Sequence, residues 1–550
     1  MADRPALPEY RGTARPRPGH RVVVVGAGIG GLVSALLLAS RGLQVTVVEA
    51  ATGPGGKMRQ VEVGGVHIDA GPTVFTMRWV FDQILAEAGS SLDALVALQP
   101  LAVLARHAWR PGADGRAQQL DLHADVRASA DAIARFAGPA EGRRYLAFCD
   151  EARRVYERLE GPHIRSPRPS VLGMIRDLGP GGLATLTGLG PFATLWARLG
   201  HHFHDPRLRQ LFGRYATYCG ASPWQAPATL MLIAHVEQSG VWSVQGGMHA
   251  LPRALAQLAG ERGATLLFGH ACRRIVVRKG RACAVQLADG RMLEADSVVF
   301  NGDANALAQG LLGDEVRHAA AAVPAARRSL SALTWAMHTR AAGLPLVRHN
   351  VFFGDDYRSE FDDIFRARRL PRDGTVYVCA QDRTDDATTL VQEVGPLAPQ
   401  GPERLLCLVN APADGDHRPF DALETDPCLS RSLALLQHCG LQLDPSPAQI
   451  VTTTPAQFHQ LFPATGGALY GAATHGWMSL FKRPGSASAL PGLYLAGGSV
   501  HPGPGVPMAA MSGRLAAETL LAHLDSTSRS RRGPISGGIS TPSATTAGTG

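Results

Sequence analysis

The sequence predicts an α/β fold in which one domain is assembled from separate stretches of chain and a second domain is inserted between them. Three observations carry this prediction. A β-branched run at residues 22–25 enters a glycine-rich turn and a buried helix, and further glycine-rich segments occur near residues 246–248 and 497–498. The chain also has 550 residues with 45% hydrophobic content, enough for the cores of two or more domains.

The first segment has the pattern of a dinucleotide-binding turn. Four valines form a strand typical of a sheet buried on both faces, and LVSALLLASR reads as a buried helix. Between them lie Gly26, Gly28 and Gly31, whose spacing permits a tight turn, close approach of a pyrophosphate and close helix packing. Glu49 ends the next buried strand, where its carboxylate can accept hydrogen bonds from ribose hydroxyls. These residues predict a Rossmann-like domain with the phosphates at the helix N-terminus.

The residues after Glu49 favour FAD over NAD. A second glycine pair, Gly55-Gly56, is followed by Lys57 and then by Gly71-Pro72, a pattern that resembles FAD-dependent amine oxidases and desaturases. The alternative is a pair of ordinary hairpin turns. Strand and helix patterns after residues 246–248, and a strand running into glycines at 493–498, indicate that the cofactor domain resumes twice. NAD-only enzymes usually keep this fold in one block, so we expect FAD.

This organisation gives the following predicted boundaries. The FAD-binding domain comprises residues 21–90, 241–310 and 490–525, and a substrate and membrane-associating domain comprises residues 91–240 and 311–489. Residues 1–20 and 526–550 are predicted to be disordered, because they offer too little apolar surface to offset the entropy of ordering.

Charge and cysteine usage exclude several classes of protein. The net charge is +8, but residues 1–21 hold five Arg against Asp3 and Glu9, and residues 525–550 hold three Arg against Asp525. The remainder is nearly neutral, so we expect no nucleic-acid partner. The eight cysteines are scattered and form no C-x-x-C pair, which predicts free thiols in a reducing compartment and no metal site. We expect a cytoplasmic protein, since neither a signal peptide nor a spanning apolar run is visible.

The chain from residue 21 to residue 524 resembles the bacterial phytoene-desaturase type of carotenoid desaturase. The segments that carry the resemblance are VVVVGAGIGGL, PGGKMRQV, IDAGPTVFTMRWVF, VWSVQGGMHALP, GWMSLFKRPGS and LYLAGGSVHPGPGVPMAAMSGRLAAE. Within that family, GGKMRQ and GGSVHPGPGVPMA look closest to the 1-hydroxycarotenoid 3,4-desaturases. The resemblance implies an FAD-dependent oxidoreductase that introduces the C3–C4 double bond into acyclic 1-hydroxycarotenoids, with oxygen or a quinone as electron acceptor.

The same resemblance implies a set of cofactor-binding residues. These are Gly26, Gly28, Gly31, Glu49, Gly56, Lys57, Gly71, Pro72, Val276, Gly498, Gly505 and Val506, with Val276 offering a backbone contact to adenine.

Two groups are candidates for the proton that desaturation releases. His501 lies in the glycine-rich turn before the last helix, with a capping or loop histidine as the alternative. Asp150 and Arg153 are spaced i,i+3 on a predicted helix, with a solvated surface ion pair as the alternative. For the substrate hydroxyl, Thr474, His475 and His501 are candidate partners.

A long polyene does not dissolve in water, so the substrate must come from a bilayer. Residues 178–197 contain no charge but are broken by glycines and prolines, with Trp196 near one end and Arg198 beside it. This pattern indicates a monotopic segment at the membrane interface, or a buried helical hairpin. We therefore expect peripheral association with the inner photosynthetic membrane. Alternative functions are a phytoene desaturase, a flavin amine oxidase and a flavin-containing carotenoid carrier.

Overall fold

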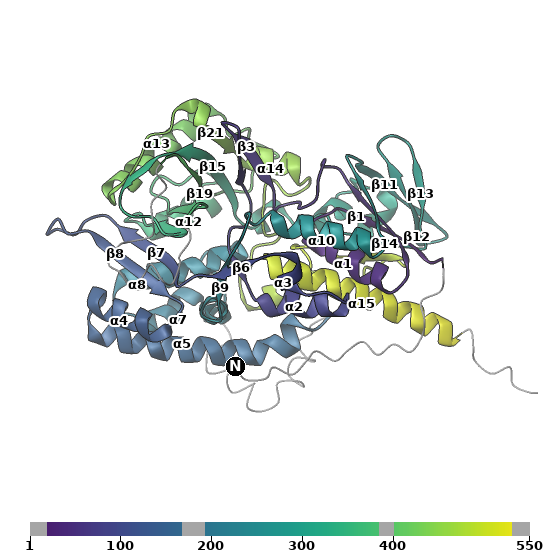
Figure 1. The fold of residues 1–550 in the computed structure, drawn as a ribbon, viewed down its shortest axis with the longest axis horizontal. Coiled ribbons are helices and arrows are strands. Elements are labelled where there is room, and N and C mark those ends of the chain that lie inside the picture. Colours follow the sequence, from purple (N-terminus) through teal and green to yellow (C-terminus); the bar gives the residue numbers. More distant parts are fainter. Residues whose placement is uncertain (1–18, 168–192, 384–400, 531–550) are drawn as a thin grey trace, which may run out of the picture.

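Two large sheets lie side by side in the computed structural model, which describes residues 19–167, 193–383 and 401–530 (Figure 1). A five-stranded sheet lies on the right of Figure 1, and a seven-stranded sheet lies on the left. Long helices cover both, and the C-terminal helix runs along the lower edge of the five-stranded sheet.

The five-stranded sheet is parallel throughout, with the strand order β10-β2-β1-β14-β22. Its strands come from three distant parts of the chain. They are β1 (Arg21–Val25), β2 (Gln44–Glu49), β10 (Thr265–Phe268), β14 (Ser297–Phe300) and β22 (Leu493–Leu495). The strand predicted at residues 22–25, the buried strand ending at Glu49, the strand expected after residues 246–248 and the strand running into the glycines at 497–498 are therefore confirmed.

Both faces of this sheet are buried, which explains why β1 is a run of valines rather than an alternating pattern. Val22 and Val24 pack against the helical layer of α1 (Ile29–Ser40), α10 (Ala250–Glu261) and α15 (Val506–Ser530). Val23 and Val25 face the opposite side, against the small antiparallel sheet of β11 (Cys272–Arg278), β12 (Arg281–Leu287) and β13 (Met292–Glu294). One strand thus joins two separate cores.

The seven-stranded sheet has the order β21-β15-β19-β18-β17-β7-β8. Neighbouring strands are antiparallel except β17 and β7. The strands are β7 (Val103–Trp109), β8 (Gln118–His123), β15 (Ser331–Thr339), β17 (His349–Phe352), β18 (Val376–Ala380), β19 (Glu403–Ala411) and β21 (Ile450–Thr453).

Helices cover both faces of this second sheet. One face carries a core shared with α4 (Val126–Ala137), α5 (Pro139–Leu159), α7 (Leu195–His202), α8 (Pro206–Gly213), the 3-10 turn η2 (Arg214–Cys219) and α9 (Leu232–Gln238). The other face packs against α13 (Ala422–His438). Helices α12 (Tyr357–Phe365) and α14 (Pro455–Leu461) complete this half.

Short elements connect the two halves. The hairpin of β3 (Gln60–Val63) and β4 (Val66–Asp69) follows β2 but lies against β15 and β21 of the second sheet. A small sheet joins β5 (Phe75–Thr76), β6 (Leu98–Pro100) and β9 (Val241–Val244), beside α2 (Arg78–Glu87) and α3 (Leu92–Leu95). Residues 60–69, which the sequence analysis assigned to the FAD-binding domain, thus contact the seven-stranded sheet. The predicted domain boundaries stay a prediction.

The described helices include none that combines the length and apolar character needed to span a bilayer.

Candidate functional site

The glycine-rich turn between β1 and α1 keeps backbone atoms close together. Gly26 has φ +100°, and its N–H donates to Val48 O on the neighbouring strand at 2.8 Å. A Cβ placed on Gly31 would lie 2.0 Å from Gly26 O, which no side chain can occupy. Gly28 is the N-cap of α1 and provides no side-chain cap. The first turn of the helix therefore offers its N–H groups, with the positive end of its dipole, to an anion.

Glu49 closes this turn from the end of β2. Its carboxylate accepts hydrogen bonds from Ala27 N at 2.7 Å and from Ala51 N at 2.9 Å. The side chain thus spans the glycine turn and the start of the next loop. Its position at the carboxyl end of the parallel strands is where ligands bind in open α/β sheets.

The second glycine pair packs on the first turn. Gly55 N donates to Ala27 O at 2.9 Å, and a Cβ on Gly56, which has φ +58°, would lie 3.2 Å from the Gly28 Cα. The two predicted motifs therefore form one glycine surface. The interpretation of Gly55-Gly56 as an isolated hairpin turn is not supported.

Lys57 turns away from this surface into the protein. Its Nζ donates to Leu469 O at 2.6 Å, and burial lowers the pKa of the ammonium group. A Cβ on Gly71 would lie 2.0 Å from Lys57 O, so these predicted residues are adjacent. Lys57 links the glycine surface to the segment that precedes Arg483.

Asp69 joins the Gly71-Pro72 segment to the distant glycines at residues 246–247. Its carboxylate accepts from Met248 N at 2.6 Å and from Gln60 Nε2 at 3.0 Å. A Cβ on Gly247 would lie 2.4 Å from the Asp69 Oδ2. The sequence motif near Met248 therefore marks a contact with this carboxylate.

Asn301 is a site residue that sequence reasoning missed. It follows β14 and lies under the turn, where its Nδ2 donates to Gly26 O at 3.2 Å. A Cβ on Gly30 would lie 2.6 Å from the Asn301 Oδ1, a buried oxygen without a hydrogen-bond partner among the described residues. Its position directly after a buried strand, at the same edge of the sheet as Glu49, is the sequence signal that could have identified Asn301 as a site residue.

The C-terminal segment closes the site from another side. Gly497 N donates to Ser512 Oγ at 2.8 Å, and Gly498 O accepts from Arg483 Nη1 at 3.3 Å. Gly505 has φ +109°, and Val506 begins α15. The backbones of α1 and α15 come very close, since a Cβ on Gly513 would lie 2.2 Å from Gly30 O.

His501 is buried in this segment. Its backbone N–H donates to Pro484 O at 2.9 Å, and the Nε2 of its ring lies 2.9 Å from His163 O. Because a carbonyl can only accept, Nε2 carries the proton and Nδ1, which has no partner among the described residues, presents a lone pair. Burial lowers the pKa of His501 to about 4, so the imidazole is neutral at pH 7.

The structure does not bring the other predicted residues to the glycine surface. Asp150 and Arg153 form an exposed ion pair on α5, with side chains 64% and 48% accessible and an O–N distance of 3.4 Å. This geometry matches the alternative of a solvated ion pair and adds no support to a catalytic role, which stays a prediction. Val276 lies in β11 at a register irregularity, and its carbonyl accepts from Cys283 Sγ. Its contact with adenine also stays a prediction.

The uncharged stretch 178–197 lies outside the described residues up to position 192. Its last residues are packed against the protein. The Trp196 ring lies 4.5 Å from that of Trp224 and 4.7 Å from the Arg209 guanidinium, and Arg198 pairs with Glu151. At this end the contacts favour the buried alternative.

Thr474 is buried and His475 is partly buried, and the imidazole of His475 accepts a hydrogen bond. The Nε2 of His475 accepts from Ser222 N at 3.1 Å, and its ring lies 4.9 Å from the Phe365 ring. Burial lowers the pKa of His475 to about 4.

A dinucleotide would satisfy the groups gathered at the carboxyl edge of the parallel sheet. The pyrophosphate fits the side-chain-free surface at the N-terminus of α1, where even a methyl group on Gly31 would collide with the backbone. The fold and this site define a protein that binds a dinucleotide of the FAD type.

Comparison with known proteins gives the family. Residues 29–521 match the flavin containing amine oxidoreductases, and the chain belongs to this family. It is 66% identical over 535 residues to hydroxyneurosporene desaturase of Rubrivivax gelatinosus, covering 97% of this chain and 99% of the relative. The protein of the same name from Cereibacter sphaeroides is 47% identical, over 92% of this chain and 99% of the relative. A solved putrescine oxidase shares the fold with a TM-score of 0.57 and 14% identity, over 92% of this chain and 99% of the oxidase.

These findings confirm the predicted fold class, the FAD cofactor and the assignment to an FAD-dependent oxidoreductase related to carotenoid desaturases.

Proposed function

We propose that the protein is an FAD-dependent desaturase that introduces the C3–C4 double bond into acyclic 1-hydroxycarotenoids such as 1-hydroxyneurosporene and 1-hydroxylycopene. The observation that carries the proposal is the near full-length similarity to hydroxyneurosporene desaturases, in a chain whose residues fit FAD. When bound, FAD supplies a hydride acceptor for the C–H bond that is broken.

The chain itself has to hold the cofactor and align the polyene. Gly28 and Gly31 leave space for the pyrophosphate, and Glu49 offers its carboxylate to the ribose. The C–H bond beside a polyene is already activated, because positive charge developing there is delocalised. Alignment and the removal of one proton are therefore the main tasks left to the protein.

His501 is our candidate for the group that takes this proton. Its Nδ1 has no partner among the described residues, and burial keeps the ring neutral by lowering its pKa to about 4. At pH 7 the ring is therefore in the form that can accept a proton, and a bound substrate would have to raise its pKa toward 7 for efficient general-base catalysis.

We further propose that the protein associates with the inner photosynthetic membrane without crossing it and passes its electrons to oxygen or a quinone. The support is chemical, since a carotenoid and a quinone both reside in the bilayer. Co-sedimentation with liposomes tests the first point. Leu189→Glu, in the uncharged stretch, should lower the bound fraction while FAD remains bound, and an unchanged fraction would contradict a membrane role for this stretch.

The deciding experiment uses FAD-loaded protein and liposomes that contain either 1-hydroxyneurosporene or phytoene. We expect a longer-wavelength absorbance band and the C3–C4 dehydrogenated product from the hydroxylated substrate. Preferential conversion of phytoene would replace the proposal by a phytoene desaturase. Release of hydrogen peroxide from amines would indicate an amine oxidase, and an unchanged carotenoid spectrum with oxidised flavin would indicate a carrier.

A further inference from the structure

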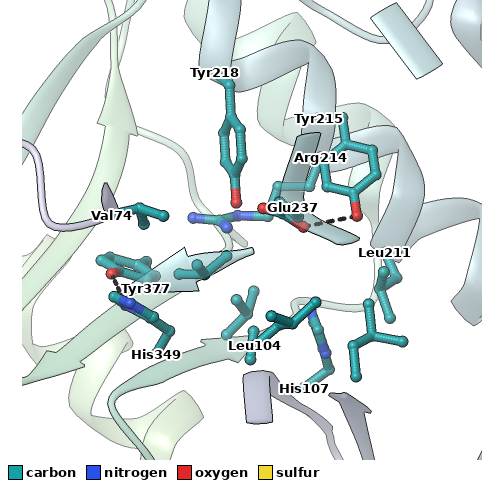
Figure 2. A pocket seen from close by; sticks show the side chains of 14 residues that line it. Val74, Leu104, His107, Leu211, Arg214, Tyr215, Tyr218, Glu237, His349 and Tyr377 are labelled. Carbon is teal, nitrogen blue, oxygen red and sulfur yellow. Dashed lines mark hydrogen bonds between the residues drawn. The ribbon is translucent and has the colours of Figure 1, made fainter. Parts of the chain in front are cut away.

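A small cavity, lined by apolar side chains and by several polar ones, lies between the seven-stranded sheet and the helices α8, η2 and α9 (Figure 2). Its volume is about 30 Å³, room for one or two water-sized groups. Leu104, Leu211 and Val74 provide apolar walls, whereas Arg214 and Glu237 enter from the helical side. A group with the volume of a hydroxyl fits this space, and an extended polyene does not.

The cavity adjoins residues expected at the flavin. Val74 lines it and follows Pro72 by two positions. Thr73, between them, has its Oγ1 2.6 Å from the hydroxyl of Tyr377, which also lines the cavity. Two bonds separate C1 of the proposed substrate from C3, so a hydroxyl on C1 has to be bound close to the reacting carbons.

On the sheet side, His349 presents an unused nitrogen. Its Nδ1 lies 2.7 Å from the Tyr377 hydroxyl, and its Nε2 has no hydrogen-bond partner in the described part of the chain. The residue is only 3% exposed. Whichever tautomer is present, this nitrogen is left with one unmade hydrogen bond, and a buried group of this kind destabilises the protein unless something binds it.

On the helical side, Arg214 has no carboxylate in bidentate contact. Its guanidinium lies over the rings of Tyr377 and Tyr218, at 5.2 and 5.9 Å, and its Nε has no partner among the described residues. Figure 2 shows the guanidinium extending into the centre of the cavity, between Glu237 and Val74. The guanidinium therefore lies beside the cavity with at least its Nε–H donor unused among the described residues.

The carboxylate of Glu237 already has a hydrogen-bond donor within the protein. It accepts a hydrogen bond from Tyr215 Oη at 2.8 Å, and burial raises the pKa of this carboxyl group. Burial also lowers the pKa of His349 to about 3, so this imidazole is neutral at pH 7. The cavity therefore presents a guanidinium and a neutral imidazole with an unused nitrogen, and both groups can form hydrogen bonds with a hydroxyl.

We infer that Arg214 and His349 bind the tertiary hydroxyl of the 1-hydroxycarotenoid end group and make the enzyme selective for hydroxylated substrate. The hydroxyl oxygen accepts from the guanidinium of Arg214, and the hydroxyl forms the missing hydrogen bond at the His349 Nε2. Tyr377 is a positioning residue, because its hydroxyl fixes the His349 ring. This inference rests on the proposed function and names the part of the chain that recognises the substrate.

This arrangement of Arg214 and His349 explains both the binding of a 1-hydroxycarotenoid and the rejection of a carotene that lacks the hydroxyl. A carotene without the hydroxyl would leave the Nε of Arg214 and the Nε2 of His349 unpaired. Sites built to hydrogen-bond a substrate hydroxyl reject the analogue that lacks it strongly, by about a thousandfold or more.

The test is a competition between 1-hydroxyneurosporene and neurosporene, which lacks only the added water, in mixed liposomes with FAD-loaded protein. For wild type we expect a preference of about a thousandfold in kcat/KM. Arg214→Met and His349→Phe should each reduce this preference by about tenfold or more, chiefly through kcat/KM for the hydroxylated substrate. Arg214→Lys and His349→Gln, which retain a donor, should lose less.

Tyr377→Phe and Tyr357→Phe form a matched pair. Each removes one hydroxyl from a buried tyrosine, but Tyr357 lies in the aromatic cluster around Trp224 and its hydroxyl has no partner among the described residues. We expect Tyr377→Phe to raise KM for 1-hydroxyneurosporene and to lower the preference. Tyr357→Phe should leave both unchanged.

The outcomes separate this inference from the function on which it rests. If wild type prefers neurosporene or phytoene, the proposed substrate is wrong. If wild type prefers 1-hydroxyneurosporene and the Arg214 and His349 variants retain that preference with FAD bound, the inference is wrong and the function stands. For a variant that loses FAD, the corresponding conservative variant decides, and an unchanged preference there also overturns the inference.

Discussion

The two large sheets of this protein form their sites from different parts of the chain: one from backbone atoms and the other from side chains. The parallel sheet prepares its ligand site from backbone, with glycines at 26, 28 and 31 keeping side chains out and Glu49 and Asn301 adding single polar contacts. The seven-stranded sheet prepares its cavity from side chains, with buried histidines, tyrosines and a partly buried arginine between strands and helices.

The difference follows from the ligands. A dinucleotide has phosphates that backbone N–H groups can bind, so one backbone geometry serves many proteins. A carotenoid has almost no polar atoms, so selectivity between carotenoids depends on the few side chains that meet its one hydroxyl. We therefore expect changes in the parallel sheet to affect cofactor binding as a whole, and changes in the other sheet to affect stability or substrate choice.

The largest effect should come from the glycine turn. Gly31→Ala places a Cβ 2.0 Å from a backbone oxygen, whereas Gly53→Ala, in the following loop, meets nothing within 4 Å. We expect Gly31→Ala to abolish flavin binding, measured as loss of the yellow absorbance of purified protein, and Gly53→Ala to retain it. A full flavin spectrum for Gly31→Ala would contradict the position of the cofactor.

A buried ion pair in the other half should give the next largest effect. Arg383 and Glu403 form two hydrogen bonds at 2.7 and 2.8 Å, with side chains 4% and 2% accessible. Removing one partner of such a pair costs about 3–5 kcal/mol, so Arg383→Met should lower the free energy of urea unfolding by about that amount. The matched change Arg274→Met, in the exposed pair with Glu315, should cost less than about 1 kcal/mol. Equal effects would show that burial does not distinguish the pairs.

Glu49→Ala tests the polar contact of the parallel sheet. It removes the acceptor of Ala27 N and Ala51 N and the predicted ribose contact. We expect FAD affinity, measured by fluorescence titration of the apoprotein, to fall by about 1.5–3 kcal/mol. The exposed Glu62→Ala provides the control and should leave affinity unchanged.

Acid should destabilise the protein through its buried imidazoles. Burial lowers the pKa of His107 to about 4 and of His349 to about 3 in the half with the seven-stranded sheet, and it lowers the pKa of His501, near the parallel sheet, to about 4. In the unfolded chain these groups titrate near pH 6.5, so the unfolded state binds more protons below that pH and stability falls as pH falls. Each should cost about 2 kcal/mol between pH 6.5 and pH 5. Urea unfolding at both pH values should show a smaller difference for His107→Phe, and an unchanged difference would contradict its buried neutral state.

The smallest effect should be that of Asp150→Asn. The pair with Arg153 is exposed, and such pairs contribute about 0.2–1 kcal/mol. We expect carotenoid conversion to change less than twofold, within about 0.4 kcal/mol. A loss of conversion with FAD retained would restore the catalytic role that the sequence suggested.

The parallel sheet could be predicted almost completely from the sequence because its rules are local. Val22 to Glu49 form one continuous β-α-β unit, and strand, turn and helix each have their own pattern. The contacts of Asp69 and Asn301 could not be predicted, since each depends on a segment far away in the chain.

The cavity was invisible to sequence reasoning for a further reason. Arg214 and Glu237 lie on helices, while His349 and Tyr377 lie on strands of a mixed sheet whose order does not follow the chain. Each residue alone has an ordinary explanation, as a surface charge or a core aromatic. Only the three-dimensional arrangement shows that their polar atoms converge.

The place of β22 in the parallel sheet has a consequence for biosynthesis. The sheet begins at Arg21, yet its strand β22 and the helix α15 that packs against α1 are translated after the whole inserted half. The glycine turn emerges early but obtains the contacts of Gly497 and Gly513 only after that half has been made. Loading with FAD is therefore a late event, and a nascent chain must keep a half-built nucleotide domain from aggregating while the inserted half is being made.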